Sequence, residues 1–454
     1  MAAKTRDMTV GSPAKLALSF ALPLMLGNVC QQFYTITDAA IVGQFAGLDA
    51  LSALGSADWM VWMVFGVISS VMHGFGIPMA QAFGAGDRAG LKRLVYTAGF
   101  VSLAISLSYT ALGLIAIDPL LTLLGTLDSL FNKAAAYLYI MVSGAVLTTG
   151  YNLLSSILRA LGNSRAPLIA MVASSAANIA LDLLFVWAFQ WGVVGAAAAT
   201  LISQAAACGV CLAYALKINE LRGNDVALRL YRPEAGKLLR LSLPMALQSA
   251  MIGVGGMALQ KVINGLGKEF VAGFTATNKL YGIMEAAAVA FGMAVVTYVG
   301  QNLGAKKVGR IRDGMKRFVP LGILMSGVMT LVLFLFGETF LRLFIEKGAP
   351  ASTTRVALRY LKTMAATLGV LYLLYVYRSA LLGIGNTFIP MISGFAECFV
   401  RVGVAVTLTA LAGKSGIYWA ETSAWSAAML ILLVSWYVKQ RGLEGEAPKP
   451  NKVK

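Results

Sequence analysis

Charged side chains are rare in the long apolar stretches of the 454-residue sequence, and five of those that occur there stand out as candidates for function. They are Asp38, Asp182, Glu285, Glu397 and Arg401. A charged side chain within a lipid bilayer is costly, so residues of this kind are candidates for function. Carboxylates in such surroundings can bind and release a cation, which includes a proton, Na⁺ or a charged organic molecule.

Two of these acids belong to a polar layer in the first half of the chain. A helix that begins near Ala166 and rises about 1.5 Å per residue places Asp182 about 24 Å along its axis, with Asn178 one turn before it on the same face. The same arithmetic brings further polar residues from other helices to this level. The layer comprises Asp38, Tyr137, Asn178, Asp182 and Thr200. We therefore predict an ion-coupling site in which Asp38, Asp182 and Asn178 could also hold Na⁺.

The two acids of this layer have no basic residue nearby in the same half of the sequence. Two neighbouring carboxylates in a low dielectric are not both ionised at little cost, so a proton or Na⁺ should be shared between them. A structural hydrogen-bond network that fixes helix packing is the alternative. Asn152 is also assigned to the site, but it lies lower in its helix, and packing explains it equally well.

A second group of charges lies near the middle of the second half. Glu285 is about 17 Å into its helix, and Glu397 precedes Arg401 by one helical turn. Together these three residues carry a formal charge of −1, which would attract an organic cation, and we predict that they bind substrate. The alternative is an ion pair that only neutralises Arg401.

Pro23 lies about four helical turns before Asp38 in the same apolar stretch. A proline inside a helix removes a backbone hydrogen bond and kinks the helix. We predict a hinge at Pro23, with a static kink as the alternative.

The elements that must position these residues are helices that cross a membrane. Apolar residues make up 58% of the sequence and charged residues only 13%, about half the share in soluble domains. Apolar runs long enough to cross a hydrocarbon core of about 30 Å recur along the chain and predict an all-α polytopic membrane protein with twelve spans. The spans are 15–46, 56–83, 91–117, 133–158, 166–190, 193–216, 238–264, 274–302, 317–345, 355–383, 388–412 and 416–438.

The net charge of +17 reflects the orientation of these spans. With the amino terminus in the cytoplasm, 26 of the 37 Lys and Arg residues fall on the cytoplasmic side and eight on the outside. Both termini are therefore predicted to be cytoplasmic. Because the excess charge faces anionic lipid, the expected partner is the bilayer of the cell membrane and not nucleic acid.

Three short motifs recur in the same order in the two halves of the chain. Ala-Leu-Pro at Pro23 is matched by Ser-Leu-Pro at Pro244, Gln81–Ala85 by Gln301–Ala305, and Gly162-Asn163 by Gly385-Asn386. The separation between the two copies is nearly constant for the three pairs, and it is close to half of the chain. Six spans per copy give both halves the same orientation in the membrane.

The repeat divides the chain into two lobes of six helices. We predict an amino-terminal segment 1–14, a first lobe 15–216, a cytoplasmic linker 217–237, a second lobe 238–438 and a cytoplasmic tail 439–454.

The motifs taken together resemble those of the multidrug and toxic compound extrusion (MATE) transporters of the MOP flippase superfamily. The resemblance covers nearly the whole chain. It is carried by Gln31-Gln-Phe-Tyr-Thr-Ile-Thr-Asp38, Ile157-Leu-Arg-Ala-Leu-Gly-Asn-Ser-Arg-Ala-Pro167, Asn178-Ile-Ala-Leu-Asp182, Gly195-Ala-Ala-Ala-Ala-Thr200 and Val299-Gly-Gln-Asn-Leu-Gly-Ala305.

This resemblance implies two six-helix lobes arranged as a V and the efflux of cationic, amphipathic compounds in exchange for H⁺ or Na⁺. It also implies that the predicted polar layer is the family's amino-lobe cation site, and that ion binding there bends the helix at Pro23. Family members with an ion site in the second lobe place acids in the seventh and tenth helices. The corresponding stretches here, 238–264 and 355–383, contain none.

We expect a monomeric transporter that uses no cofactor beyond the coupling ion. A lipid-linked oligosaccharide flippase of the same superfamily is the main alternative, although it would need several buried basic groups. An enzyme is not expected, since the sequence has one histidine and no HExxH or nucleophile motif.

Overall fold

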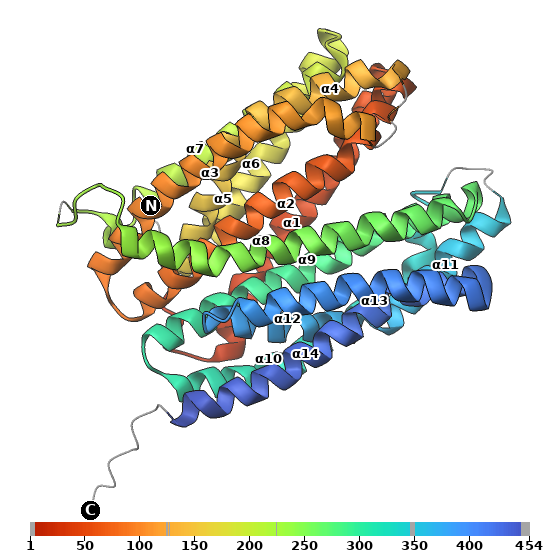
Figure 1. The fold of residues 1–454 in the computed structure, drawn as a ribbon. Coiled ribbons are helices and arrows are strands. Elements are labelled where there is room, and N and C mark those ends of the chain that lie inside the picture. Colours follow the sequence, from red (N-terminus) through yellow and green to blue (C-terminus); the bar gives the residue numbers. More distant parts are fainter. Residues whose placement is uncertain (1–4, 124–125, 127, 224, 346–349, 446–454) are drawn as a thin grey trace, which may run out of the picture. The chain divides into compact units, whose positions relative to one another are not determined.

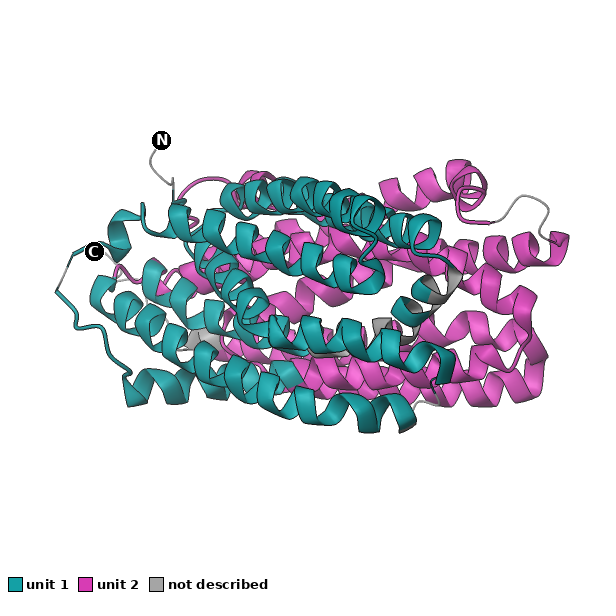
Figure 2. Ribbon diagram, turned by 90° about the horizontal axis from the view of Figure 1, so that it is seen from above, with its two compact units in different colours: residues 1–6, 22–83, 87–246 teal, residues 7–21, 84–86, 247–454 magenta. Residues whose placement is uncertain are grey.

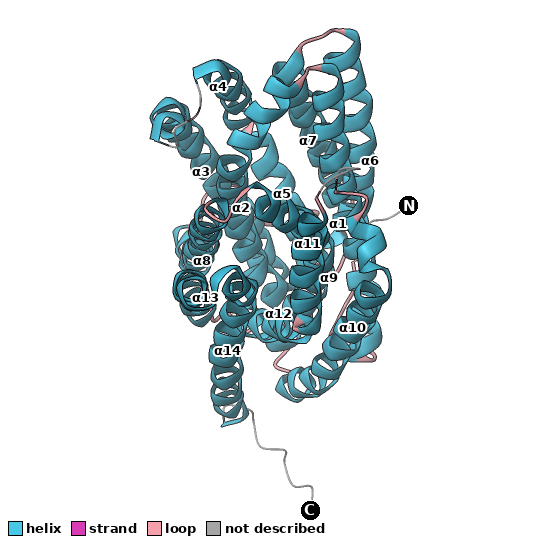
Figure 3. Ribbon diagram, turned by 90° about the vertical axis from the view of Figure 1, so that its right-hand side faces the viewer, coloured by secondary structure: helices cyan, strands magenta, loops and turns pink. Residues whose placement is uncertain are grey.

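The computed structural model describes residues 5–123, 126, 128–223, 225–345 and 350–445, without the side chains of 48–49, 51–52, 55–60, 62–64, 123 and 443–445. Within these ranges the regular elements are all helices (Figure 1, Figure 3). The long helices are α1 (Pro13–Phe45), α2 (Leu48–Gly84), α3 (Arg88–Leu123), α4 (Asp128–Ser143), α5 (Ala145–Ala160), α6 (Arg165–Asp182), α7 (Gly192–Ala215), α8 (Arg232–Asn264), α9 (Lys268–Gly304), α10 (Val308–Leu341), α11 (Ala351–Ala366), α12 (Leu368–Gly383), α13 (Phe388–Ala412) and α14 (Ala420–Gly445). Three short helices, η1 (Leu183–Ala188), η2 (Asn219–Leu221) and η3 (Gly413–Trp419), lie between them.

Each of the twelve predicted spans coincides with one helix or with one pair of consecutive helices. By length and composition, eight helical stretches of the described residues can cross a membrane, and ten can if each of two bent pairs forms one span. One of the eight, Phe388–Gly442, contains both α13 and α14, and α2 is not among the eight. The predicted all-α polytopic fold is confirmed.

The two bent pairs occupy equivalent positions in the sequence repeat. The pair α4 and α5 bends by 47° and the pair α11 and α12 by 48°. The bends lie at Gly144 and Thr367, whose separation along the chain equals that between Gly162 and Gly385. At Gly144 a Cβ atom would lie 2.2 Å from the Leu201 side chain of α7, so a larger residue there would require Leu201 to move. At Thr367 the hydroxyl donates to the carbonyl of Thr363 (3.0 Å), a bond that bends helices.

The turns that follow these pairs also repeat. Gly162 and Gly385 have φ angles of +78° and +83°, a conformation that favours glycine. The next residue in each copy is an asparagine whose Oδ1 accepts a hydrogen bond from the backbone N–H three residues later, at 3.0 Å for Asn163 and 3.2 Å for Asn386. The repeat inferred from short motifs is therefore a repeat of local structure.

The chain forms two compact units, which Figure 2 distinguishes by colour. Unit 1 comprises residues 1–6, 22–83 and 87–246, and unit 2 comprises residues 7–21, 84–86 and 247–454. In unit 2, helix α9 packs against α10, α11 and α12, and two thirds of its most apolar window is buried. In unit 1, α7 packs against α4, α5 and α6. The helices that carry the predicted site residues are therefore packed on several sides.

The linker that follows α7 is held to the start of α3 by two ion pairs within unit 1. The ammonium group of Lys92 is buried and donates to the carboxylate of Asp225 and to the carbonyl of Arg222. The guanidinium of Arg93 donates to Glu234 (2.8 Å). The hydrogen bond from Lys92 lowers the pKa of Asp225 below its ordinary value. This contribution to stability is present at neutral pH and is lost as the pH falls through the lowered pKa.

Candidate functional site

Helix α6 turns a polar stripe toward the interior of unit 1. Ser175, Asn178 and Asp182 are spaced by three and four residues, so they share one helical face, and all three are buried. Asn178 is 1% exposed and Asp182 is 0% exposed. The amide atoms of Asn178 and the carboxylate oxygens of Asp182 make no hydrogen bond of ordinary geometry within the described residues. Buried polar atoms of this kind are rare in folded proteins, and they can serve as ligands.

Asp38 of α1 lies beside Asp182, within reach of a hydrogen bond between the two carboxyl groups. Ionised carboxylates only accept hydrogen bonds, so such a bond requires one proton on the pair. Tyr34 precedes Asp38 by one turn and interacts with the charges of both acids. The structure thus brings together three of the predicted residues, Asp38, Asp182 and Asn178, and adds Tyr34, which sequence analysis did not assign to the site.

The helix changes form directly after Asp182. Residues Leu183–Ala188 form the π-helix η1, whereas sequence analysis predicted one regular helix over 166–190. Its wider turns allow the ring of Phe185 to stack on Trp191 at 5.0 Å, and the N–H of Trp191 donates to the carbonyl of Phe185 (2.9 Å). Short π-helical segments often occur at functional sites, and this one begins at the buried acid.

The remaining residues of the predicted layer have different surroundings. Tyr137 is buried in an apolar cluster that includes Ile41, which is close to Asp38 in α1. Thr200 lies half-buried on α7, which packs against α6. Asn152 accepts a hydrogen bond from Ser69 of α2 (3.1 Å) and donates one to a carbonyl of its own helix (2.9 Å). These contacts of Asn152 fit the packing alternative.

Pro23 lies inside α1, close to the point where this helix passes from unit 2 to unit 1. Residues up to Ala21 belong to unit 2 and residues from Leu22 onward to unit 1. The equivalent proline, Pro244, lies inside α8, which passes between the units at 246–247. Both prolines therefore lie within one helical turn of a point where the chain changes units.

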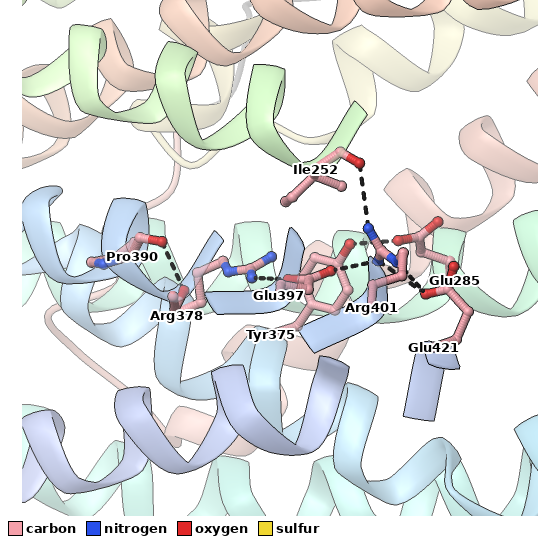
Figure 4. Close-up of polar contacts among 9 residues, drawn as sticks. Ile252, Glu285, Tyr375, Arg378, Pro390, Glu397, Arg401 and Glu421 are labelled. Atoms are coloured by element: carbon pink, nitrogen blue, oxygen red, sulfur yellow. Dashed lines mark hydrogen bonds and ion pairs between the residues drawn. The ribbon is translucent and has the colours of Figure 1, made fainter. Parts of the chain in front are cut away.

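Unit 2 contains a chain of four alternating charges, drawn in Figure 4. Arg378 Nη2 donates to Glu397 Oε2 (2.9 Å), and Glu397 Oε1 accepts from Arg401 Nη2 (3.0 Å). The same Nη2 atom of Arg401 contacts Glu421 Oε2 (2.9 Å), and Nη1 donates to the carbonyl of Ile252 (3.3 Å). Three helices, α12, α13 and α14, are joined by this buried network.

A glycine makes room for the network. A Cβ atom on Gly255 of α8 would lie 3.0 Å from Arg401 Nη1 and 3.2 Å from the backbone of Cys398. Any larger residue there would push α13 away from α8 and lengthen the bond from Arg401 to Ile252.

Glu285 is held by tyrosines instead of arginines. The hydroxyl of Tyr375 donates to Glu285 Oε1 (2.8 Å), and Tyr281, one helical turn before Glu285, interacts with its charge. The ring of Tyr281 stacks on Trp425 at 5.6 Å. Within the described residues, no basic side chain forms an ion pair with Glu285. Since the network of four charges is neutral, Glu285 leaves a formal charge of −1 in this region.

Two members of the network are not among the residues that the sequence assigns to the site. Arg378, one of the 26 basic residues assigned to the cytoplasmic side, is 8% exposed within α12 and paired with Glu397. Its position inside the apolar span 355–383 is the sequence signal for this role. Glu421 is the second carboxylate partner of Arg401.

The MatE family model matches residues 23–184 and again residues 244–407. The two matches begin at the two repeated prolines, Pro23 and Pro244. The chain belongs to the MatE family. Each lobe of the sequence repeat therefore corresponds to one MatE unit.

Curated relatives of this MatE chain are named as drug resistance or export proteins. The chain is 30% identical over 371 residues to the probable multidrug resistance protein YpnP of Bacillus subtilis, covering 82% of this chain and 83% of the relative. It is 25% identical to the probable multidrug resistance protein NorM of Thermotoga maritima, covering 87% and 85%. It is 25% identical to the multidrug export protein MepA of Staphylococcus aureus, covering 92% and 93%.

Solved structures share the fold of this MatE protein at lower sequence identity. A MOP superfamily transporter from Pyrococcus furiosus aligns with a TM-score of 0.90 at 22% identity, covering 97% of this chain and 99% of that one. An outward-facing MATE transporter aligns with a TM-score of 0.88 at 23% identity, covering 97% and 100%. The chain is thus a multi-pass membrane protein with the MATE fold.

Proposed function

We propose that this MatE protein is a secondary antiporter that exports cationic, amphipathic organic compounds in exchange for H⁺ or Na⁺. The proposal rests on the two acids Asp38 and Asp182, which interact within unit 1, and on Asn178, whose amide atoms have no hydrogen-bond partner within the described residues. Two neighbouring carboxylates in a low dielectric repel each other when both are ionised. A pair of ionised acids there is therefore a binding site for a cation.

Either coupling ion would relieve this repulsion. A proton on one carboxyl group allows it to donate to the other. Na⁺ would take both carboxylates and the Oδ1 atom of Asn178 as ligands, since hard cations prefer oxygen. Ions that enter down their gradient would thus change the charge next to α1, the helix that contains Pro23.

The substrate would be recognised in unit 2. Glu285 contributes the uncompensated negative charge, Tyr375 donates to it, and Trp425 stacks on the neighbouring Tyr281. Aromatic faces and a carboxylate together attract organic cations. The names of the relatives as multidrug proteins support several substrates of this class.

A lipid-linked oligosaccharide flippase remains the second candidate. Arg378 adds one buried basic group to Arg401, as a diphosphate substrate would require. Both guanidinium groups already contact carboxylates, however, so neither is available to a phosphate without breaking an ion pair. This arrangement favours a cationic substrate.

Transport by purified protein in liposomes tests the proposal. A pH gradient and an Na⁺ gradient are imposed in separate experiments, and movement of a fluorescent organic cation is followed. We expect gradient-dependent transport with one of the two ions. Failure with both ions, in protein that retains its thermal unfolding transition, would contradict antiport.

We predict that Glu285→Gln weakens transport of cationic dyes and spares neutral ones. The change removes the formal charge of −1 but keeps the shape of the side chain and its bond from Tyr375. Loss of one attractive charge in a partly buried site should raise KM for cations by about tenfold. Initial rates for a matched pair of cationic and neutral dyes measure the effect, and equal losses for both would assign Glu285 to coupling or structure.

We predict that Pro23→Ala lowers the rate of turnover more than it lowers substrate affinity. Alanine restores the missing backbone hydrogen bond and straightens α1, while no substrate contact is removed. Substrate binding and transport are measured on the same preparation. Pro320→Ala is the matched control, because Pro320 is inside α10 and that helix belongs wholly to unit 2. Unchanged turnover in Pro23→Ala would indicate that Pro23 forms a static kink and not a hinge.

We also infer that the chain acts as a monomer in the cell membrane, with both termini and the linker 217–237 in the cytoplasm. Positive charge in these segments supports this orientation. Protease accessibility of tags at each terminus in sealed vesicles would test the orientation, and light scattering would test the oligomeric state.

A further inference from the structure

A basic cavity of about 430 Å³ lies where the start of α1 meets α10 in unit 2. Its lining residues are Pro13, Arg310, Asp313, Lys316 and Arg317. Three basic side chains and one acidic side chain give it a formal charge of +2. No residue of the coupling or substrate sites lines it.

The inner wall of this cavity is held in place by Arg310. Its Nη2 atom donates to the carbonyl of Gly11 (2.9 Å), and its Nε atom donates to Asn302 Oδ1 (3.1 Å). The outer wall is different, because Lys316 and Arg317 are exposed. Within the described residues, neither of them forms an ion pair. Two cations at the rim are thus available to an anion.

Helix α10, which supplies four of the five lining residues, also carries an exposed apolar stripe. Leu324, Val328, Leu331 and Leu335 are 57–66% exposed and are spaced by four, three and four residues, so they form one helical face. Arg317 precedes Leu324 by two turns and lies on the same face. At about 1.5 Å per residue, the stripe from Arg317 to Leu335 is about 27 Å long, close to the thickness of a hydrocarbon core.

We propose that this cavity binds the phosphate headgroup of an anionic phospholipid whose acyl chains lie along the stripe of α10. A free phosphate would use only the cations, whereas a phospholipid would also place its acyl chains on the apolar face of the same helix. A zwitterionic lipid would bring its own cation to a region that already has a charge of +2. The ligand that matches both features carries net negative charge and long acyl chains.

Binding at this position would join the start of α1 to α10. Pro13 is the first residue of α1 and lines the same cavity as Lys316 and Arg317. A lipid held there should stabilise the folded protein in proportion to its occupancy.

The test compares two variants that lose the same charge. Lys316→Gln/Arg317→Gln removes the rim of the cavity, and Lys439→Gln/Arg441→Gln removes two exposed basic residues from α14. Binding of phosphatidylglycerol and phosphatidylcholine to the full chain in detergent is measured by native mass spectrometry, with the thermal unfolding temperature as a second readout. Inorganic phosphate is added as a soluble competitor.

We expect wild-type protein and the α14 variant to prefer phosphatidylglycerol, and the α10 variant to bind it about tenfold more weakly. Asp313→Asn should tighten binding, since it removes the one acid of the cavity. Equal weakening in the α10 and α14 variants would show an unspecific charge effect and overturn the site. Unchanged binding of phosphatidylglycerol in the α10 variant would also overturn the lipid site. Displacement of the lipid by millimolar phosphate would show that the cavity binds soluble anions instead of a lipid headgroup.

Discussion

Asp38→Asn and Asp182→Asn are each expected to reduce gradient-driven efflux to less than about one tenth of the wild-type rate, because a coupling site that has lost one ionisable carboxyl group cannot exchange its cation. Asparagine keeps nearly the same volume and removes the repulsion between the two acids. The variants should therefore fold as well as the wild type. Transport in proteoliposomes and thermal unfolding are measured on the same preparations.

The matched control is Asp118→Asn. Asp118 is an exposed acid of α3, so its loss should leave efflux unchanged. Normal efflux in both Asp38→Asn and Asp182→Asn would show that the coupling site does not lie in unit 1.

Asn178→Ala tests which ion is coupled to transport. It should weaken transport driven by Na⁺, which would lose an oxygen ligand, more than transport driven by protons.

The second large effect concerns stability. Glu397→Gln should lower the free energy of unfolding by about 3 kcal/mol, because it leaves the buried Arg378 and Arg401 with one charged partner between them instead of two. Only Glu421 then faces Arg401, and Arg378 loses its ion pair. Thermal and denaturant unfolding in detergent measure the change.

Glu338→Gln is the control for this prediction. Glu338 forms an ion pair with Arg342 at the same spacing of four residues, at 2.7 Å, but both side chains are largely exposed. Exposed pairs contribute at most about 1 kcal/mol, so this variant should unfold close to wild type. Similar stability of the two variants would mean that the network of Arg378, Glu397, Arg401 and Glu421 contributes no more than a surface pair.

Much of the fold follows from local patterns in the sequence. Apolar runs predicted the spans because every backbone polar group must be hydrogen-bonded inside a bilayer, and a helix forms these bonds within one segment. Motifs such as Gly162-Asn163 and Gly385-Asn386 predicted the repeat, since equivalent turns need equivalent glycine and asparagine residues. Intrahelical pairs such as Glu397 with Arg401 were also predictable, because a spacing of four residues fixes the shared face.

The bends at Gly144 and Thr367 are less visible in the sequence. The bend at Gly144 lies against the side chain of Leu201, and the bend at Thr367 accompanies the hydrogen bond of its own hydroxyl to the carbonyl of Thr363. The π-helix after Asp182 is likewise accompanied by a local contact, the stacking of Phe185 on Trp191. The periodicity of apolar residues is averaged over several helical turns, so it does not reveal such single contacts.

Contacts between distant helices were decided by the tertiary structure alone. The sequence spacing of residues 378, 397 and 421 does not indicate that Arg378 pairs with Glu397 or that Glu421 pairs with Arg401. These pairs depend on the rotation of each helix about its axis, which is set by the packing of all neighbouring helices. The same holds for the partnership of Asp38 with Asp182, which are far apart in the sequence. The sequence by itself indicated which residues belong to apolar spans and which of them share a helical face. Packing decided which of them meet, since a bilayer penalises an unpaired charge but does not choose its partner.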